Sequence, residues 1–150
     1  TLIVDSTTIN CPNLFTNEFN GHKKKKCTKI HVVLDLNKTV KLFEVGIGSE
    51  HDSNFLQNNS RKILDMNPRN FLADAAYFSS SLKSFFESSF CRFLVPKKLQ
   101  RISHKLYKKR ILIENFFASL KQFRGIERSF VRKLENLKSN LSVAFSLLLL

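Results

Sequence analysis

The stretch TKIHVVLDL at residues 28–36 decides the fold, because its side chains alternate with the period of two that a β-strand requires. One face of this strand is strongly apolar and the other is mixed: the first carries Ile30, Val32, Leu34 and Leu36, the second His31, Val33 and Asp35. A tight turn is predicted at Asn37-Lys38, and TVKLFEVGI at residues 39–47 is rich in β-branched and aromatic residues. The sequence therefore predicts an antiparallel hairpin over these two segments.

Strands and helices are predicted on both sides of this hairpin. TLIVD at residues 1–5 indicates a first strand that ends near Asp5, and a polar loop is predicted from Asn10 to Asn20. Beyond the hairpin, the predicted elements are a helix over residues 54–64, a strand in NFLADAAY at 70–77 that ends at Asp74, a helix capped by Ser79 to Ser81, a strand in RFLVP at 92–96, and helices from His104 to Phe123 and from about Phe130 to the end. Because the hairpin is antiparallel and the later strand–helix–strand passage makes a parallel crossover, we expect an α/β fold with a mixed sheet flanked by helices.

The composition indicates one domain with a basic surface. A chain of 150 residues with 43% hydrophobic content can form one core, which excludes a disordered tail and an assembly of several domains. Its formal net charge of +13 makes a polyanion the expected partner, with nucleic acid ahead of a membrane surface. The longest apolar stretch, LSVAFSLLLL at residues 141–150, has about half of the roughly 20 residues that a membrane span needs, so we expect no membrane partner.

The cysteines and the first residue add two expectations. Cys11, Cys27 and Cys91 form no C-x-x-C pair, which argues against a disulfide framework or a zinc site and for a reducing compartment. The chain starts with Thr1 rather than Met, so we expect it to be an excerpt of a longer reading frame or a processed piece.

The helix predicted around residues 107–123 carries a polar stripe. At 100° per residue, Tyr107, Arg110, Glu114 and Lys121 fall within an arc of roughly 60°. The apolar residues gather on a different, broad arc that can pack against a sheet: Leu112, Ile113, Phe116, Phe117, Leu120 and Phe123. Taken alone, the pattern is also that of a solvated amphipathic helix with an incidental Arg–Glu pair.

Together with two aspartates, the glutamate of this stripe could form a metal-binding site. Asp5 and Asp74 end predicted strands, where the ligand sites of open α/β sheets gather, and Glu114 lies on the helix. Carboxylate oxygens are hard ligands that suit Mg²⁺ or Mn²⁺. Two such ions about 3.5–4 Å apart can activate a water and stabilise the leaving oxygen of a phosphodiester. The positive charge of the chain would then bind the DNA whose backbone is cut.

Several short motifs are spread along the chain, and the last of them has fixed residue types at fixed gaps. They are VDST at 4–7, the basic run that leads into TKIHVVLD at 28–35, GSEHDS at 48–53, LADAAY at 72–77, and the set Tyr107, Arg110, Glu114 and Lys121, which reads Y-x2-R-x3-E-x6-K. This combination resembles the catalytic domain of the DDE transposases encoded by bacterial insertion sequences. The resemblance covers about residues 2–145 and implies a ribonuclease-H-like fold, with residues 1–150 as a single catalytic domain.

The resemblance implies a role for each matching residue. The implied catalytic residues, which would together coordinate two Mg²⁺ or Mn²⁺ ions, are Asp5, Asp74 and Glu114. The implied contacts to the DNA backbone near the cleaved end are Tyr107, Arg110 and Lys121.

The resemblance also implies a reaction and its partners. The reaction is metal-dependent cleavage at the ends of an insertion sequence, followed by attack of the freed 3′ hydroxyl on target DNA in cut-and-paste transposition. The partners are double-stranded DNA, at the element ends and at the target, and a second copy of the chain on that DNA. The implied location is the cytoplasm, at the nucleoid, in a bacterium, or the nucleus in a eukaryotic host.

Departures from the family pattern keep a second interpretation open. Ala76 stands where the family often has Gly, and Ala75 stands where several members have a basic residue. The amino-terminal region that the family uses for end recognition and dimerisation is expected to be lacking. The alternative is an inactive remnant or a domesticated module that binds DNA through Arg110, Lys121 and the basic run HKKKK at residues 22–26 but does not cleave it.

Other polar residues have an ordinary structural interpretation beside a functional one. Lys23, Lys24, Lys25 and Lys26 fit a solvated loop as well as a DNA-backbone contact. His51 and Asp52 are interpreted as the cap of the helix at Asn54 rather than as a hydrolytic dyad. We expect Cys91 to be buried packing and His31 to be a partly buried residue with its hydrogen bonds satisfied.

Overall fold

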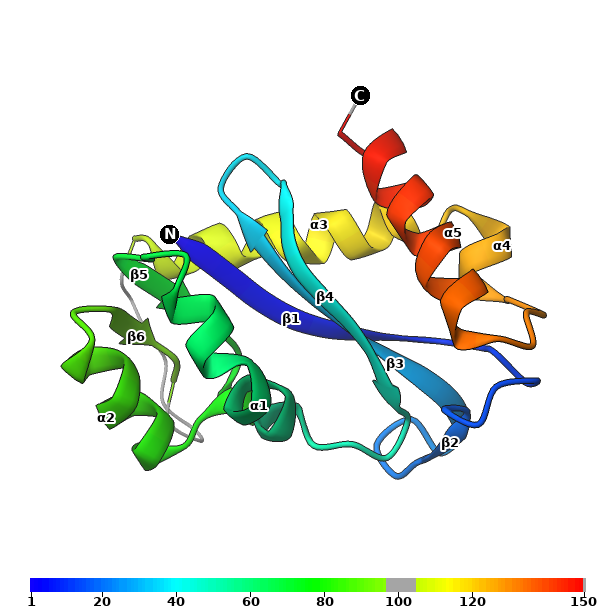
Figure 1. The fold of residues 1–150 in the computed structure, drawn as a ribbon, viewed down its shortest axis with the longest axis horizontal. Helices are drawn as coiled ribbons and strands as arrows, with labels where there is room; N and C mark the ends of the chain where they lie inside the picture. The colour runs from blue at the N-terminus through cyan, green and yellow to red at the C-terminus, as the bar shows by residue number, and fades with distance from the viewer. Residues whose placement is uncertain (97–104, 150) are drawn as a thin grey trace.

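The computed structural model describes residues 1–96 and 105–149, which form a mixed sheet with helices on both faces (Figure 1). Its strands are β1 (Leu2–Ile9), β2 (Glu18–Asn20), β3 (Lys25–Asp35), β4 (Val40–Ile47), β5 (Asn70–Leu72) and β6 (Arg92–Leu94). Strand β3 pairs antiparallel with β1, β2 and β4, whereas β1, β5 and β6 are parallel neighbours. The predicted hairpin and the predicted mixed sheet are confirmed.

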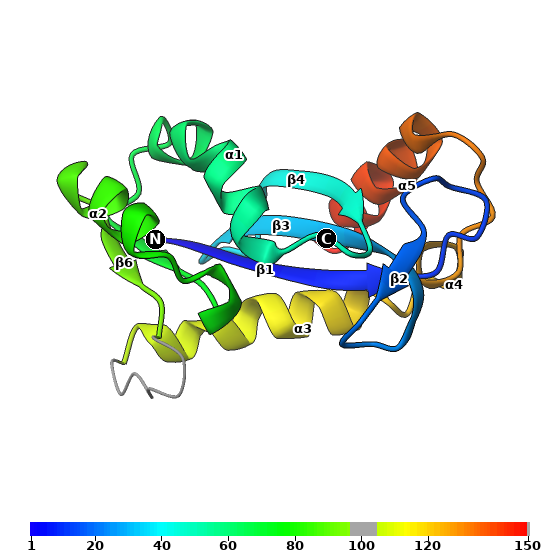
Figure 2. The same ribbon diagram turned by 90° about the horizontal axis from the view of Figure 1, so that it is seen from below.

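Helices cover the two faces of the sheet, and each face has its own apolar core. Helices α1 (Asp52–Leu64) and α2 (Ser80–Ser88) pack on one face with residues such as Val4 and Val33. Helices α3 (Ile111–Leu120) and α5 (Leu134–Leu147) pack on the other face, and a short helix, α4 (Arg124–Glu127), joins them. Figure 2 shows α1 and α3 on opposite sides of the sheet. Strand β3 is buried on both faces because it lies inside the sheet between these two layers.

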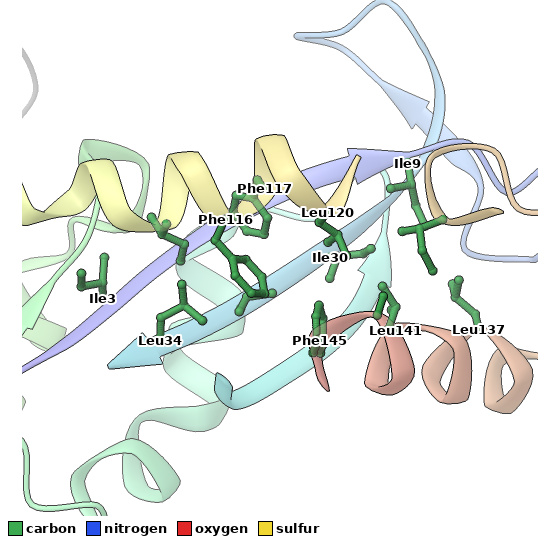
Figure 3. Packing of buried hydrophobic residues seen from close by; sticks show 14 of the residues in the cluster. Ile3, Ile9, Ile30, Leu34, Phe116, Phe117, Leu120, Leu137, Leu141 and Phe145 are labelled. Atoms are coloured by element: carbon green, nitrogen blue, oxygen red, sulfur yellow. The ribbon is translucent and has the colours of Figure 1, made fainter. Parts of the chain in front are cut away.

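The core beneath α3 and α5 holds the strand that carries Asp5. Residues of both helices meet Ile3 and Ile9 of β1 and Ile30 and Leu34 of β3 (Figure 3). On α3 the buried side chains recur at helical spacing: Ile113, Phe116, Phe117 and Leu120. This packing fixes α3 along β1, so the remaining faces of α3 have a defined place relative to the strand.

Several boundaries differ from those predicted. Strand β1 does not end near Asp5 but continues to Ile9, because Ser6, Thr7 and Thr8 pair with His31, Ile30 and Lys29 of β3. The loop predicted from Asn10 to Asn20 contains the short strand β2. Strand β5 ends at Leu72, and a 3₁₀ helix, η1 (Ala75–Tyr77), follows Asp74.

The carboxy-terminal helices are also shorter than predicted. A second 3₁₀ helix, η2 (Tyr107–Arg110), precedes α3, which ends at Leu120, and the last helix begins at Leu134 rather than near Phe130. The predicted helix start at His104 lies outside the described residues.

Cys11, Cys27 and Cys91 are buried free thiols, so the predicted burial of Cys91 is confirmed. In the part of the chain that the structure describes, no helix has the length and apolar character that crossing a membrane requires.

Candidate active site

Strand register places Asp5 and Asp74 on the same face of the sheet. In the parallel pair of β1 and β5, Ile3 is the partner of Leu72, and both side chains belong to the core beneath α3. Asp5 and Asp74 each follow by two residues, and alternation along an extended chain returns both to that same face. Asp5 therefore lies within β1, and Asp74 lies just beyond β5, rather than both ending strands as the sequence predicted.

Helix α3 presents Arg110 and Glu114 to these aspartates. Arg110 is the last residue of η2 and the cap of α3, and Glu114 lies one turn further along the helix. Because the apolar face of α3 is buried against β1 and β3, the neighbouring polar face meets the edge of β1 where Asp5 lies. The helical spacing of Tyr107, Arg110 and Glu114 thus predicts their common side correctly.

One guanidinium contacts all three acids. Nη2 of Arg110 lies 2.9 Å from Oδ2 of Asp5 and 4.0 Å from Oε1 of Glu114, and Nη1 lies 3.7 Å from Oδ1 of Asp74. The Arg110 side chain is only 14% exposed, whereas those of Asp74 and Glu114 are about half-exposed. The contact with Asp5 is therefore the strongest of the three, because it is the shortest and the least screened by solvent.

Tyr107 completes the surroundings of the guanidinium. Nη1 of Arg110 donates a hydrogen bond to the Tyr107 hydroxyl at 3.2 Å, and the guanidinium carbon lies 5.7 Å from the centre of the Tyr107 ring. The sequence predicted that Tyr107 and Arg110 hold DNA; in the structure Arg110 pairs with the acids and Tyr107 contacts Arg110.

The electrostatics of this site are dominated by burial and by opposite charge. Burial raises the pKa of the Asp5 carboxyl, an effect that Arg110 and the Ser6 N–H oppose and the nearby charge of Asp74 adds to. Burial alone would lower the pKa of Arg110, but the charge of Asp5 and the contacts with Tyr107 and Asp74 outweigh it and raise that pKa. Arg110 is consequently a fixed positive charge among the acids.

The chemistry of the three acids fits a hard divalent cation, because all of them are oxygen donors that converge on one positive group. As the side chains stand, no three His, Cys, Asp or Glu residues within 1–96 and 105–149 are close enough together to hold a metal ion. The point on which the three acids converge is the Arg110 guanidinium. The donor set of Asp5, Asp74 and Glu114 is therefore present, arranged around a cation of the protein itself.

The predicted basic residues gather at the other end of α3. Lys121 caps the carboxy-terminal end of this helix, and the run HKKKK forms the turn between β2 and β3 and the start of β3, with all four lysines exposed. Partial burial lowers the pKa of Lys121, and the charges of Lys23 and Lys25 lower it further. Lys121 and the turn thus belong to one positive region, roughly 16 Å along the helix from Arg110 by the rise per residue.

A hollow of about 880 Å³ lies between this turn and the segment that follows Asp74. Asn20, Gly21 and His22 of the turn line it on one side, and Ala75 and Ala76, which directly follow Asp74, line it on another. The buried Lys29 and the partly buried Asp52 also border it. One opening in the surface is therefore bordered by the turn and by the residues that directly follow Asp74.

Sequence reasoning missed the partners of Asp52. His51 does cap α1 by position, but its side chain makes no capping hydrogen bond. Asp52 lies in the first turn of α1, where Oδ1 accepts hydrogen bonds from Oγ of Ser6 at 3.0 Å and from Nζ of Lys29 at 3.1 Å. The predicted capping role is thus wrong for the His51 and Asp52 side chains, because Asp52 binds β1 and β3 instead.

His31 is also more deeply buried than predicted. Its Nδ1 lies 3.2 Å from the Tyr77 hydroxyl, its ring stacks on Phe55 at 4.5 Å, and its Nε2 is buried with no hydrogen-bond partner among the described residues. The prediction of satisfied hydrogen bonds therefore holds for one ring nitrogen only.

Comparison with known proteins matches the chain to one described family. The sequence model of a family described as "Transposase DDE domain" matches residues 1–150. A search of curated proteins found no match.

A solved structure shares the fold. A chain in the cryo-EM structure of the simian T-cell lymphotropic virus intasome with PP2A regulatory subunit B56 gamma matches with a TM-score of 0.60 and 18% identity, over 96% of this chain and 46% of that one. The magnesium complex of the HTLV-2 integrase catalytic core domain, in its dimeric form, has a TM-score of 0.49 and 14% identity, over 99% of this chain and 81% of that one. This chain spans less than half the length of the first of these proteins. The predicted ribonuclease-H-like fold is confirmed.

Proposed function

Because the chain belongs to the Transposase DDE domain family, we propose that it catalyses metal-dependent cleavage and strand transfer of DNA during transposition of an insertion sequence. The observation that carries this proposal is the convergence of three acids from three distant segments on the Arg110 guanidinium. Pairs of exposed charges form readily anywhere on a surface, but a partly buried group of three carboxylates around one cation has a cost in desolvation that structural stability does not require.

In this proposal Asp5, Asp74 and Glu114 are the catalytic residues and would hold two Mg²⁺ or Mn²⁺ ions. Bound ions would supply Lewis-acid stabilisation of the charge that develops on the phosphodiester oxygens. Arg110 would keep the acids oriented and add positive charge beside the scissile phosphate, while Tyr107 fixes the guanidinium. Burial of Asp5 and Arg110 limits access of water, which strengthens these charge interactions.

The DNA would extend from the acids toward the basic end of α3. Lys121 and the exposed Lys23, Lys24, Lys25 and Lys26 would neutralise backbone phosphates. Double-stranded DNA at the element ends and at the target is the proposed partner. Joining two ends also needs two copies of the chain, so we propose a homodimer on DNA.

Nicking of a supercoiled plasmid tests the proposed function without knowledge of the element ends. We expect conversion to the open circle in Mn²⁺ or Mg²⁺, and none when the ion is chelated. DNA binding with no nicking in either ion, across protein concentrations that saturate the plasmid, would overturn the catalytic proposal and leave a DNA-binding remnant.

The basic region gives a separate prediction for DNA binding. Replacing Lys121 by Ala should weaken binding and lower the slope of log K against log salt by about 1, because one phosphate contact is lost. The measurement is fluorescence anisotropy of a labelled duplex between 50 and 200 mM salt. Lys138→Ala, on an exposed position of α5, is the matched control and should leave the slope unchanged. Equal slopes for Lys121→Ala and the parent would argue against a backbone contact at Lys121.

A further inference from the structure

The segments that carry Asp5 and Asp74 are held from the opposite face of the sheet by the beginning of α1. Ser6 and His31 are cross-strand partners in β1 and β3, and their side chains lie on the α1 face, away from Asp5. Asp52, in the first turn of α1, accepts the Ser6 hydroxyl and the Lys29 ammonium on the same atom, Oδ1. These contacts tie together residues that are 46 and 23 positions apart in the sequence.

The hydrogen bond between Asp52 and Ser6 affects Asp5 directly, because Ser6 also contacts Asp5. The Ser6 N–H donates a hydrogen bond to Oδ1 of Asp5 at 2.8 Å, so the orientation of the Ser6 peptide sets the orientation of the Asp5 carboxylate. The Ser6 hydroxyl is fixed by Asp52 at 3.0 Å on the other side of the strand. One residue of β1 thus links a catalytic carboxylate on one face of the sheet with Asp52 on the other.

The second aspartate is connected to the same cluster through η1. This 3₁₀ helix starts directly after Asp74, whose side chain accepts the Ala75 N–H at 2.6 Å, and it ends at the buried Tyr77. The Tyr77 hydroxyl meets Nδ1 of His31 at 3.2 Å, and that nitrogen lies 3.9 Å from Oδ1 of Asp52.

Asp52 itself is held firmly. The Lys29 ammonium pairs with it at 3.1 Å and also donates to the Glu50 carbonyl, and the Lys29 side chain is 9% exposed. A carboxylate in the first turn of a helix is further stabilised by the helix dipole. The Asp52 carboxylate is therefore a rigid anchor between α1, β1 and β3.

We propose that Asp52 is a positioning residue for the metal-binding acids, acting on Asp5 through Ser6 and supporting the Asp74 turn through the His31–Tyr77 contact. This inference rests on the proposed function, because it concerns the geometry of the acids assigned to the metal. Outer contacts that orient metal ligands typically contribute 10- to 100-fold to metal affinity. Asp52 reaches the metal-binding acids through one intervening residue, so we expect it to contribute about 10-fold to metal affinity, the lower end of that range.

The test is Mn²⁺ binding measured by calorimetry on the full chain in the absence of DNA. Asp52→Ala removes both hydrogen bonds and should weaken Mn²⁺ binding about 10-fold. Asp52→Asn keeps an oxygen at the position that accepts both donors, so it should restore the affinity to within about 3-fold of the parent. If Asp52 has only a structural role, folded Asp52→Ala and folded Asp52→Asn should bind Mn²⁺ with the same affinity.

Two control variants make the outcome unambiguous. Asp35→Ala removes a comparable set of contacts, to the Asn37 and Thr39 N–H groups and to Lys41, at the distant β3–β4 turn, and should lower thermal stability without changing Mn²⁺ affinity. Asp5→Asn should abolish binding. Parent-like affinity of Asp5→Asn would refute the proposed function, whereas loss in Asp5→Asn with parent-like affinity of Asp52→Ala would refute the positioning role alone.

Ser6→Ala covers the case in which Asp52→Ala does not fold. This variant removes the hydroxyl that Asp52 holds but keeps the N–H that Asp5 accepts, and it should weaken Mn²⁺ binding several-fold. An affinity equal to that of the parent in folded Ser6→Ala would overturn the connection between Asp52 and Asp5.

Discussion

Replacing Asp74 by Asn is expected to abolish plasmid nicking in Mn²⁺, with a loss of about 10³-fold or more, while DNA binding stays close to that of the parent. A metal ion contributes several kcal/mol to a phosphodiester transition state, and a lost ligand charge removes much of that contribution. The fold should tolerate the change. The Asp74 side chain is 51% exposed, its contact with Arg110 is 3.7 Å long, and an amide oxygen still accepts the Ala75 N–H.

The control for this variant is an acid that lies away from the site. Asp65 is exposed at the carboxy-terminal end of α1, and Asp65→Asn should nick at the parent rate. Equal nicking by Asp74→Asn and the parent would remove Asp74 from the catalytic site. Loss of DNA binding together with nicking would show that the substitution acts on the DNA-binding surface rather than on metal-dependent chemistry.

The second large effect is a loss of stability on acidification that depends on His31. Burial lowers the pKa of His31 from 6.5 to about 4, against the opposing effect of the Asp52 charge and with a further lowering from Lys29. A histidine with a lowered pKa binds its proton more tightly in the unfolded chain, so stability is present above pH 6.5 and is lost as the pH falls toward 4. Between pH 7 and pH 5 the parent should lose about 2 kcal/mol of unfolding free energy through this group.

The window stops at pH 5 because other groups act in the opposite sense below it. Burial raises the pKa of Asp5 and of Glu50, so the folded state gains relative stability as these carboxyls bind protons. Urea unfolding at pH 7, 6 and 5 measures the effect. His31→Gln should flatten the profile, and His22→Gln, at an exposed position in the basic turn, should keep the slope of the parent. A flat profile for the parent would contradict the burial of a neutral His31.

The central strands of the fold could be predicted because their patterns are local. TKIHVVLDL alternates strongly enough to identify β3, and the β-branched residues after the turn identify β4. The end of β1 was mispredicted because Ser6, Thr7 and Thr8 are polar and interrupt the apolar run, while their pairing with β3 continues the strand. Strand β2 is equally dependent on its pairing with Lys25, Lys26 and Cys27, which no local pattern indicates.

For the candidate site too, the local spacing could be predicted and the contacts between separate elements could not. The period of the helix predicts that Tyr107, Arg110 and Glu114 share one side, and the resemblance assigns Asp5 and Asp74 to the same centre. The sequence did not predict that Arg110 pairs with Asp5 and Asp74, because these contacts depend on how α3 packs against β1. Asp52 was missed for a related reason: its partners Ser6 and Lys29 lie on two other elements, and its position beside His51 resembles an ordinary helix cap.

The central claim is that Asp5, Asp74 and Glu114 form one divalent-cation site, and the most direct test is the location of Mn²⁺ by its anomalous scattering in crystals soaked with the ion. Anomalous density is expected in contact with the carboxylates of all three residues. Density confined to other acids, such as Glu50 or Asp52, or no density at saturating Mn²⁺, would contradict it.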